Sequence, residues 1–394
     1  MTEIQLDIEQ VKNNLEKVAN LYNSGEKGYT RLAFSNEEDN AIAWVQKELE
    51  LLGAEVRIDG VGNLFGRIGP SNVKAIAFGS HLDTVKNGGL FDGALGVFVG
   101  LECLRTLKEN QFDKQTAYEL ICFKAEEGNP LGGTFGSRAA SGKIDLNTIA
   151  INLLKSFNFS KDDIIKSEKS FPKYKAFLEL HIEQGTVLEN NHNKIGIVTN
   201  IAGISRNHIT VKGSAGHSGT MPMHSRKDAL VKASEIVTHV HEEAKRRGNG
   251  IVATIGQLQV NPNLPTVIPE SVDFTFEVRG GKQDEIDFFE QEISTWIKDN
   301  YEVEVEKGVR KNANHLSAEI IQRLNDTAED LDISVLNLVS GANHDANSLT
   351  TETEVGMVFV PSINGISHNP EESSDWKYIE QAAQIMFKTL MNFN

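Results

Sequence analysis

The fold is decided by Gly79-Ser-His-Leu-Asp-Thr-Val-Lys-Asn-Gly-Gly-Leu-Phe-Asp-Gly93, which carries His81, Asp83 and Asp92. The residues before it, 73–78, are rich in apolar types and alternate, which predicts a strand. The apolar residues after it, 94–107, predict a helix. Imidazole and carboxylate groups gathered at a strand end suit a borderline cation such as Zn²⁺. Histidine-x-aspartate alone is a weak signal, because such residues often serve ordinary loop hydrogen bonds, so a metal site needs further ligands elsewhere.

Further residues of the metal-ligating types follow other predicted strands. Glu126 and Glu127 come after the strand predicted over 117–123 and precede a glycine-rich loop, and His181 ends the strand predicted over 175–180. Ligands in α/β sheets gather at the carboxyl ends of the strands. Adjacent carboxylates can also be ordinary surface residues. At a strand exit, however, one could bind a metal ion while the other stays free as a general base.

Taken together, the candidate ligands comprise two carboxylates and three imidazoles: His81, Asp92, Glu127, His181 and His368. This set suffices for two metal ions that share Asp92. Two ions about 3.5 Å apart can hold a bridging hydroxide and polarise a carbonyl together.

Length and charge limit the classes of protein. The chain has 394 residues, which favours two domains. Its net charge of −16 argues against nucleic acid or an anionic membrane as partner. Neither a secretion signal nor an apolar run of about 18 residues is apparent, so we expect a cytoplasmic protein. Cys103 and Cys122 lie in apolar segments and are expected to be buried free thiols.

The order of predicted elements indicates an α/β domain with a second domain inserted into it. Residues 1–203 and 312–394 alternate strands and helices, which predicts a mixed, largely parallel sheet. Residues 204–311 follow the order β-α-β-β-α-β, which is typical of a ferredoxin-like unit. The other expected helices and strands are: helices at 5–22, 36–52 (with a Ser35/Glu38 capping box), 225–246, 283–300, 317–331 and 374–391; strands at 54–59, 63–68, 194–201, 208–213, 251–260, 272–279, 301–306, 334–339 and 356–360. The polar residues 143–174 are interpreted as a solvated excursion.

Several separated motifs resemble one known family. They are His81-Leu-Asp83, Phe91-Asp-Gly-Ala-Leu-Gly96, Glu126-Glu-Gly128, Gly133-Thr-Phe-Gly-Ser-Arg138, His181-Ile-Glu-Gln-Gly185, Gly216-His-Ser-Gly-Thr220 and Ser367-His-Asn-Pro-Glu371. In this order they resemble the N-carbamoyl-L-amino acid hydrolases and allantoate amidohydrolases, a branch of the dinuclear zinc aminoacylase and carboxypeptidase clan. The resemblance extends from Gly28 to the C-terminal helix.

The resemblance implies a dinuclear metal-dependent amidohydrolase. One ion would be held by His81, Asp92 and His181, and the other by Asp92, Glu127 and His368. Zinc is expected, although imidazole and carboxylate ligands also accept manganese, cobalt or nickel. The inserted domain would act as a lid and as the interface of a homodimer.

The same resemblance implies two catalytic residues. Glu126 would be the general base that takes a proton from the bridging water and passes it to the departing nitrogen. Asp83 would orient the His81 ring by accepting its second N–H.

Five further residues are implied to contact a small carbamoyl or ureido substrate. His217 would hydrogen-bond the developing oxyanion, and Arg279 would bind the substrate carboxylate with its planar guanidinium. Gln184 and His344 would line the pocket. Thr266 stands where the family usually has an asparagine that contacts the substrate.

Two alternatives stay open at this stage. The first is an aminoacylase or dipeptidase of the same clan, although His181 stands where the peptidases of the clan have an acidic ligand. The second is a binding protein that holds a ureido or amino acid ligand without turnover. A binding protein would be expected to have lost a ligand or Glu126, and all of these residues are present.

Overall fold

A computed structural model describes residues 4–110, 115–192 and 195–393 of the chain. These residues form two compact units. Unit 1 contains the residues up to Thr199, His315–Leu338 and the residues from Ala342 onward, whereas unit 2 contains Asn200–Asn314 and Val339–Gly341.

The main sheet has a parallel centre. In the described residues its strand order is β1-β2-β4-β3-β5-β16-β6-β14, and β15 also pairs with β6. β3 is parallel to β4 and β5, and β5 is parallel to β16, whereas β1, β2 and β6 join by antiparallel pairs. The strand bounds are β1 Glu55–Ile58, β2 Leu64–Ile68, β3 Ala75–His81, β4 Ala117–Phe123, β5 Ala176–Ile182, β6 Ile195–Ile201, β14 Asn314–His315, β15 Val335–Ser340 and β16 Glu354–Val360. The mixed sheet is confirmed, although it is parallel only at its centre, because β1, β2 and β6 pair antiparallel. Lys194, the predicted start of β6, lies outside the described residues.

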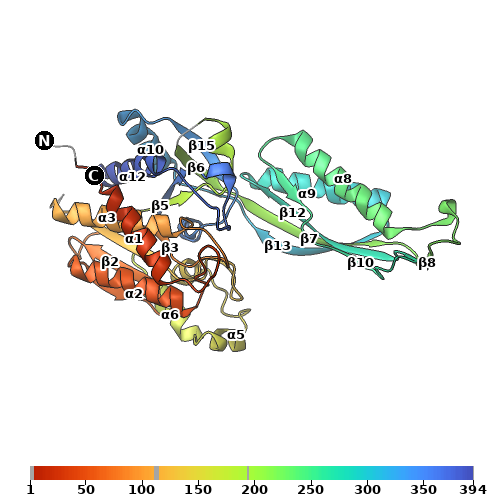
Figure 1. The fold of residues 1–394 in the computed structure, drawn as a ribbon, viewed down its shortest axis with the longest axis horizontal. Coiled ribbons are helices and arrows are strands. Elements are labelled where there is room, and N and C mark those ends of the chain that lie inside the picture. Colours follow the sequence, from red (N-terminus) through yellow and green to blue (C-terminus); the bar gives the residue numbers. More distant parts are fainter. Residues whose placement is uncertain (1–3, 111–114, 193–194, 394) are drawn as a thin grey trace. The chain divides into compact units, whose positions relative to one another are not determined.

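Helices cover this sheet because its central strands are apolar throughout. All residues of β3, β4 and β5 are buried, as expected of parallel strands that are covered on both faces. α3 packs on these three strands, α1 packs on α3, and α12 packs on β5 and β16 (Figure 1). The helix bounds are α1 Ile8–Leu21, α2 Asn36–Leu51, α3 Ala94–Glu109, α4 Phe135–Ala140, α5 Ile151–Ser156, α6 Lys161–Ser170, α7 Val187–Asn190, α10 Ala318–Asp330, α11 Asp345–Leu349, α12 Trp376–Met391 and the 3₁₀ turn η2 Ile363–Gly365.

Alternation along β5 separates the core from polar residues. Leu178 and Leu180 belong to the apolar core that α3 and α12 complete. Successive side chains of a strand point to opposite faces, so Glu179 and His181 face away from this core. The strand therefore places an imidazole at its carboxyl end without interrupting the apolar face.

Unit 2 has the predicted split βαβ arrangement. Its sheet order is β10-β12-β7-β13, with β9 also pairing β12, and all of the pairs are antiparallel. α8 and α9 pack on this sheet around a separate apolar cluster. The bounds are β7 Gly203–Lys212, β8 Gly216–His217, the 3₁₀ turn η1 Met223–Ser225, α8 Ala229–Arg247, β9 Val252–Thr254, β10 Leu258–Asn261, β11 Val267–Ile268, β12 Ser271–Gly280, α9 Gln283–Asn300 and β13 Val303–Lys311.

Three local predictions differ from the structure. The strand predicted over 251–260 is interrupted, because β9 and β10 each pair with a different part of β12. Glu38 does not complete a capping box. Ser35 accepts a hydrogen bond from the Glu38 N–H at 3.2 Å, but the Glu38 carboxylate turns to other partners. The segment 143–174 is not only solvated, since Leu154 and Ile164 are buried in a cluster with Phe135.

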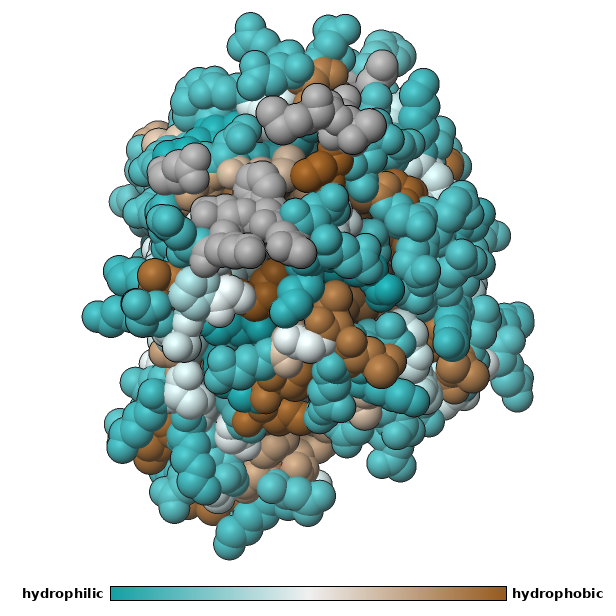
Figure 2. Space-filling model, turned by 90° about the vertical axis from the view of Figure 1, so that its left-hand side faces the viewer, coloured by the Kyte–Doolittle hydropathy of each residue, from teal (hydrophilic) through white to brown (hydrophobic). Residues whose placement is uncertain are grey.

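The surface agrees with the acidic, hydrophilic composition. Figure 2 shows one face of the molecule covered mainly by hydrophilic side chains, with apolar side chains in small groups between them. Among the described residues, every helix is too short or too polar to cross a membrane.

Candidate metal centre

The ends of parallel strands bring the candidate ligands to one edge of the sheet. His81, at the end of β3, lies opposite Phe123, at the end of β4, so Glu126 and Glu127 follow directly beside it. In the same way, His181 of β5 lies opposite Phe359 of β16. The loop after β16 then carries His368 to this edge.

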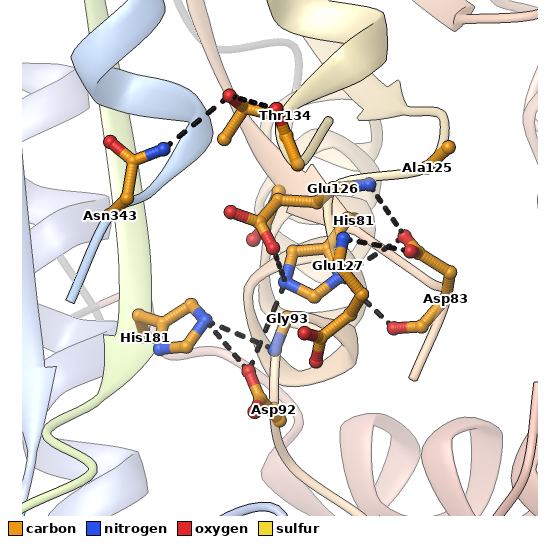
Figure 3. Close-up of polar contacts among 12 residues, drawn as sticks. His81, Asp83, Asp92, Gly93, Ala125, Glu126, Glu127, Thr134, His181 and Asn343 are labelled. Atoms are coloured by element: carbon orange, nitrogen blue, oxygen red, sulfur yellow. Dashed lines mark hydrogen bonds and ion pairs between the residues drawn. The ribbon is translucent and has the colours of Figure 1, made fainter. Parts of the chain in front are cut away.

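Asp92 lies between three imidazoles. Its Oδ1 is 3.1 Å from Nε2 of His181 and 3.9 Å from Nε2 of His81, and its Oδ2 is 3.1 Å from Nε2 of His368. Figure 3 shows Asp92 beside His181, with His81 and the two glutamates on its other side. One carboxylate thus faces two sets of donors.

The donor atoms form two groups that share Asp92. One group is His81, Asp92 and His181, and the other is Asp92, Glu127 and His368; the ligand atoms in each lie within 4.8 Å of one another. A third group of Glu179, His181 and His344 meets the same criterion. In that group both Glu179 oxygens already accept hydrogen bonds, from Ser80 Oγ at 2.7 Å and from the Ala346 N–H at 2.8 Å.

The histidine tautomers fit a cation in the first group. Nδ1 of His81 lies 3.0 Å from the Asp83 carbonyl, and Nδ1 of His181 lies 2.9 Å from the Ile182 carbonyl. Because a carbonyl only accepts, each Nδ1 carries the hydrogen and each Nε2 presents its lone pair toward Asp92. The Gly93 N–H, which donates to His181 Nε2 at 3.2 Å, agrees with this assignment. A lone pair facing a carboxylate oxygen leaves a place for a cation between them, and nitrogen and oxygen donors suit a divalent metal ion.

The carboxylates show the same need for positive charge. Oε1 of Glu127 is buried and has no hydrogen-bond partner among the described residues. Burial raises the pKa of Glu127 to about 7, with Asp92 adding to the effect. Burial opposes ionisation of Asp92 as well, but the neighbouring imidazoles of His181 and His368 hold its pKa well below the usual range.

Glu126 belongs to neither donor group. Its Oε2 lies 3.8 Å from Nε2 of His81. Burial raises the pKa of Glu126 well above the usual value, against the attraction of His81. A carboxylate that is close to the donors, but is not one of them, is placed to exchange protons there.

Asp83 makes more contacts than the sequence predicted. Its Oδ1 lies 3.4 Å from Nδ1 of His81, on the side where an orienting role was expected. Its two oxygens also accept the N–H groups of Glu126 at 3.0 Å and Glu127 at 2.9 Å. One buried carboxylate therefore ties a histidine of the first group to the segment that carries both glutamates (Figure 3).

Two residues that the sequence analysis did not single out support Asp92. Ser367 donates its hydroxyl to Asp92 Oδ2 at 3.2 Å, and Glu372 accepts the Phe91 and Asp92 N–H groups at 2.8 and 3.1 Å. Ser367 begins the motif around His368 and Glu372 directly follows it, and this position in the sequence is what could have pointed to them. The predicted pocket residue Gln184 lies in the same place, because its amide donates to Asp92 Oδ2 at 2.9 Å.

His344 lies behind His181. Its ring is buried and its centroid is 4.5 Å from that of His181 in an edge-to-face arrangement. Burial lowers the pKa of His344 well below the usual value, and the neighbouring His181 adds to this effect, so the ring is neutral.

The other predicted substrate residues lie in unit 2. His217 in β8 pairs with Val267 of β11, and the Ser218 N–H donates to the Thr266 carbonyl at 3.0 Å, so His217 and Thr266 lie next to each other at one small two-stranded sheet. Arg279 lies in the larger sheet of that unit. Its guanidinium donates to Glu277 at 2.7 Å and to the Gly341 carbonyl at 3.1 Å.

Comparisons with known proteins relate the whole chain to amidohydrolases. The chain is 33% identical over 411 aligned positions to the N-carbamoyl-L-amino-acid amidohydrolase of Pseudomonas sp. (strain NS671), covering 99% of both chains. It is 32% identical to the allantoate amidohydrolase of Bacillus subtilis (strain 168), covering 94% of this chain and 95% of the other. A crystal structure of an amidase of the hydantoinase/carbamoylase family from Burkholderia multivorans superposes with a TM-score of 0.89 at 27% identity, covering 99% and 98% of the two chains.

These similarities confirm the resemblance seen in the motifs, the mixed α/β fold with an inserted domain, and an amidohydrolase as the kind of enzyme. Together with the donor groups around Asp92 they indicate a divalent metal site. Residues 77–392 match the family described as peptidase family M20/M25/M40, and the chain belongs to that family.

Proposed function

We propose that this protein is a dinuclear metal-dependent amidohydrolase that cleaves a linear C–N bond of an N-carbamoyl-L-amino acid or of allantoate. The observation that carries the proposal is the shared carboxylate of Asp92, which faces donor groups on both sides. The substrate class rests on the names of the relatives and on the motif resemblance.

The ligands follow from the two donor groups. His81 and His181 would hold one ion and Glu127 and His368 the other, with Asp92 between the two. Zinc suits this mixture of imidazole and carboxylate, and manganese, cobalt and nickel are the alternatives. Two bound ions would polarise the scissile carbonyl and lower the pKa of the attacking water.

Proton transfer is assigned to Glu126. Only 11% of its side chain is exposed, it lies beside His81 and it belongs to neither donor group. It would accept a proton from the attacking water and donate it to the departing nitrogen. Asp83 would keep this carboxylate in place through the backbone of residues 126 and 127.

The substrate contacts are assigned from the sequence resemblance. His217 would stabilise the oxyanion and Arg279 would bind the substrate carboxylate, with Gln184, His344 and Thr266 as further contacts. For the residues of unit 2 the proposal rests on the sequence resemblance. A homodimer through the inserted domain and a cytoplasmic location also stay predictions from the sequence.

The test is ammonia release by the metal-reconstituted protein. The panel contains allantoate, ureidoglycolate and a set of N-carbamoyl and N-acetyl L-amino acids. We expect ammonia from a carbamoyl or ureido compound, abolished by EDTA and restored by Zn²⁺ or Mn²⁺. Free amino acid from an acyl or dipeptide substrate, without ammonia, would instead assign the protein to the aminoacylases or dipeptidases.

The Glu126→Gln variant tests the assignment of the base. It should retain metal while turnover falls by about 10²- to 10⁴-fold, the usual contribution of general acid–base catalysis. Glu102→Gln is the matched control, because Glu102 is also buried with a raised pKa but hydrogen-bonds to Asp7 and Thr106. Equal turnover in the two variants would remove Glu126 from this role.

A further inference from the structure

The segment that carries Glu126 is held by side chains at every N–H group. The Lys124 N–H donates to Asn63 Oδ1 at 2.9 Å and the Ala125 N–H to Glu38 Oε1 at 2.7 Å. The next two N–H groups, of Glu126 and Glu127, donate to Asp83. Four consecutive peptide groups therefore depend on acceptors from three distant parts of unit 1.

The carbonyl groups of the same segment are held too. The Lys124 carbonyl accepts from the Gly136 N–H at 2.8 Å, the Ala125 carbonyl from Phe135 at 3.0 Å and the Glu126 carbonyl from Thr134 at 2.6 Å. The segment is thus fixed on both sides. A strand exit held in this way directs the Glu126 side chain by its backbone rather than by its own contacts.

Ala125 is the residue in this segment whose conformation needs support. Its φ is +56°, in the left-handed region that residues with a Cβ avoid. Such conformations persist where the surrounding structure determines them, and they cluster at active sites. The hydrogen bond that its N–H makes is to Glu38, so this carboxylate is one of the groups that determine it.

Glu38 is committed to this task by its other contacts. It is fully buried, and its Oε2 accepts the Phe34 N–H at 2.6 Å and lies 3.2 Å from Nζ of Lys124. Both oxygens of the carboxylate are therefore occupied, Oε1 by the Ala125 N–H and Oε2 by the Phe34 N–H and Lys124. Lys124 is also paired with the exposed Asp39.

We infer that Glu38 is a positioning residue of the hydrolase. It holds Ala125 in the left-handed conformation and thereby aims the carboxylate of Glu126 at the attacking water. The inference rests on the proposed role of Glu126 as the base, and it adds a residue from α2 to the catalytic apparatus. The Glu38 carboxylate binds the Ala125 N–H and does not complete the capping box at the start of α2.

The experiment compares Glu38→Gln with Asp39→Asn. The amide keeps the size of Glu38 but offers one oxygen to donors on two sides, so one side loses its acceptor. Asp39→Asn removes the charge of the other carboxylate beside Lys124 and leaves Ala125 untouched, which makes it the matched control. Glu38→Ala, which removes both acceptors, is the stronger variant if it folds. The readouts are kcat, KM, bound metal, and amide hydrogen exchange of the peptide that contains residues 124–127.

In Glu38→Gln we expect kcat to fall by about 10- to 100-fold, because a displacement of about 1 Å at a catalytic group has effects of that size. KM and bound metal should match the wild type, and exchange at residues 124–127 should be faster. The control should resemble the wild type in all four readouts. If Glu38 had only a structural role, the Glu38→Gln variant would melt at a lower temperature, and at temperatures below that melting point its kcat would equal that of the wild type.

Rescue adds a second check. Glycine adopts the left-handed conformation without strain, so Ala125→Gly in the Glu38→Gln background should recover part of the lost kcat. Unchanged exchange, unchanged kcat, or a double variant as slow as Glu38→Gln would each overturn the inference. If the wild type hydrolyses no compound of the panel, the proposed function fails, and exchange at residues 124–127 still decides whether Glu38 holds this segment.

Discussion

Gly93 separates the shared carboxylate of Asp92 from helix α3 and leaves no room for a side chain. Its φ is +64°, and a Cβ placed there would lie 2.3 Å from both Cε1 and Nε2 of the His81 ring. The replacement Gly93→Ala therefore acts on the geometry of the proposed metal site without removing a donor atom.

The size of the effect follows from these distances. Ordinary contacts of a Cβ begin at 3.4 Å, so the ring must move by about 1.1 Å, the difference from 2.3 Å. A shift of about 1 Å at a catalytic site lowers turnover by roughly 10²-fold. Metal affinity should fall by about 10- to 100-fold, as it does when groups that orient a ligand are altered. The positive φ adds roughly 1–2 kcal/mol of destabilisation for an alanine.

Gly53→Ala separates strain from steric overlap. Gly53 has a φ of +73° at the end of α2, and a Cβ there would meet nothing within 4 Å. This control should lose roughly 1–2 kcal/mol of stability and keep its metal affinity. The assays are competition of Zn²⁺ with a chelating dye, kcat on the accepted substrate and unfolding by urea. If Gly93→Ala matched Gly53→Ala in metal affinity and kcat, the reasoning that ties His81 to the metal site would be refuted.

Three further predictions concern support of the site, charge and the core. Glu372→Gln should weaken metal binding by about 10- to 100-fold, because Glu372 anchors the backbone of Asp92; an unchanged affinity in a metal titration would contradict this. Without metal, the melting temperature should fall as pH rises from 7 to 9, because Asp345 with a pKa of about 8 and His368 with a pKa of about 9 keep protons in the folded state that the unfolded chain has already released. Adding metal should raise the melting temperature most at the higher pH, since the ligands must be deprotonated. A melting temperature of the metal-free protein that rose from pH 7 to pH 9 in calorimetry would contradict the raised pKa values of Asp345 and His368. Phe387→Ala should lower the free energy of unfolding by about 3–5 kcal/mol, because this ring is fully buried in the main core; a loss below about 1 kcal/mol would show that the site collapses around the cavity.

Local patterns predicted most elements because they depend on residues close in the chain. The strand predicted over 117–123 has those bounds in β4, and the helix predicted over 283–300 has them in α9. Predictions from local patterns failed where a residue far away in the sequence determines the contacts of a side chain. Glu38 fits a capping box by its spacing from Ser35, yet its carboxylate binds the Ala125 N–H, which lies 87 positions away. No window of local sequence contains that contact.

The segment 143–174 failed for a related reason. Its apolar residues are interrupted irregularly by lysine, asparagine, serine and aspartate, so local periodicity is weak. Leu154 and Ile164 are nevertheless buried, because Phe135 and Phe34 offer an apolar surface at that point. Burial of isolated apolar residues depends on the partner that other parts of the chain supply.

The sequence by itself determined which donors are present and that they follow strand ends, because residue types and strand patterns are local properties. It therefore indicated the composition of a metal site before any geometry was known. Only the tertiary structure decided that Asp92 lies within 3.1 Å of two histidines, and that backbone carbonyls turn the lone pairs of His81 and His181 toward it. These relations join β3, β5 and the loop after β16, and they exist only when the parallel strands align their carboxyl ends.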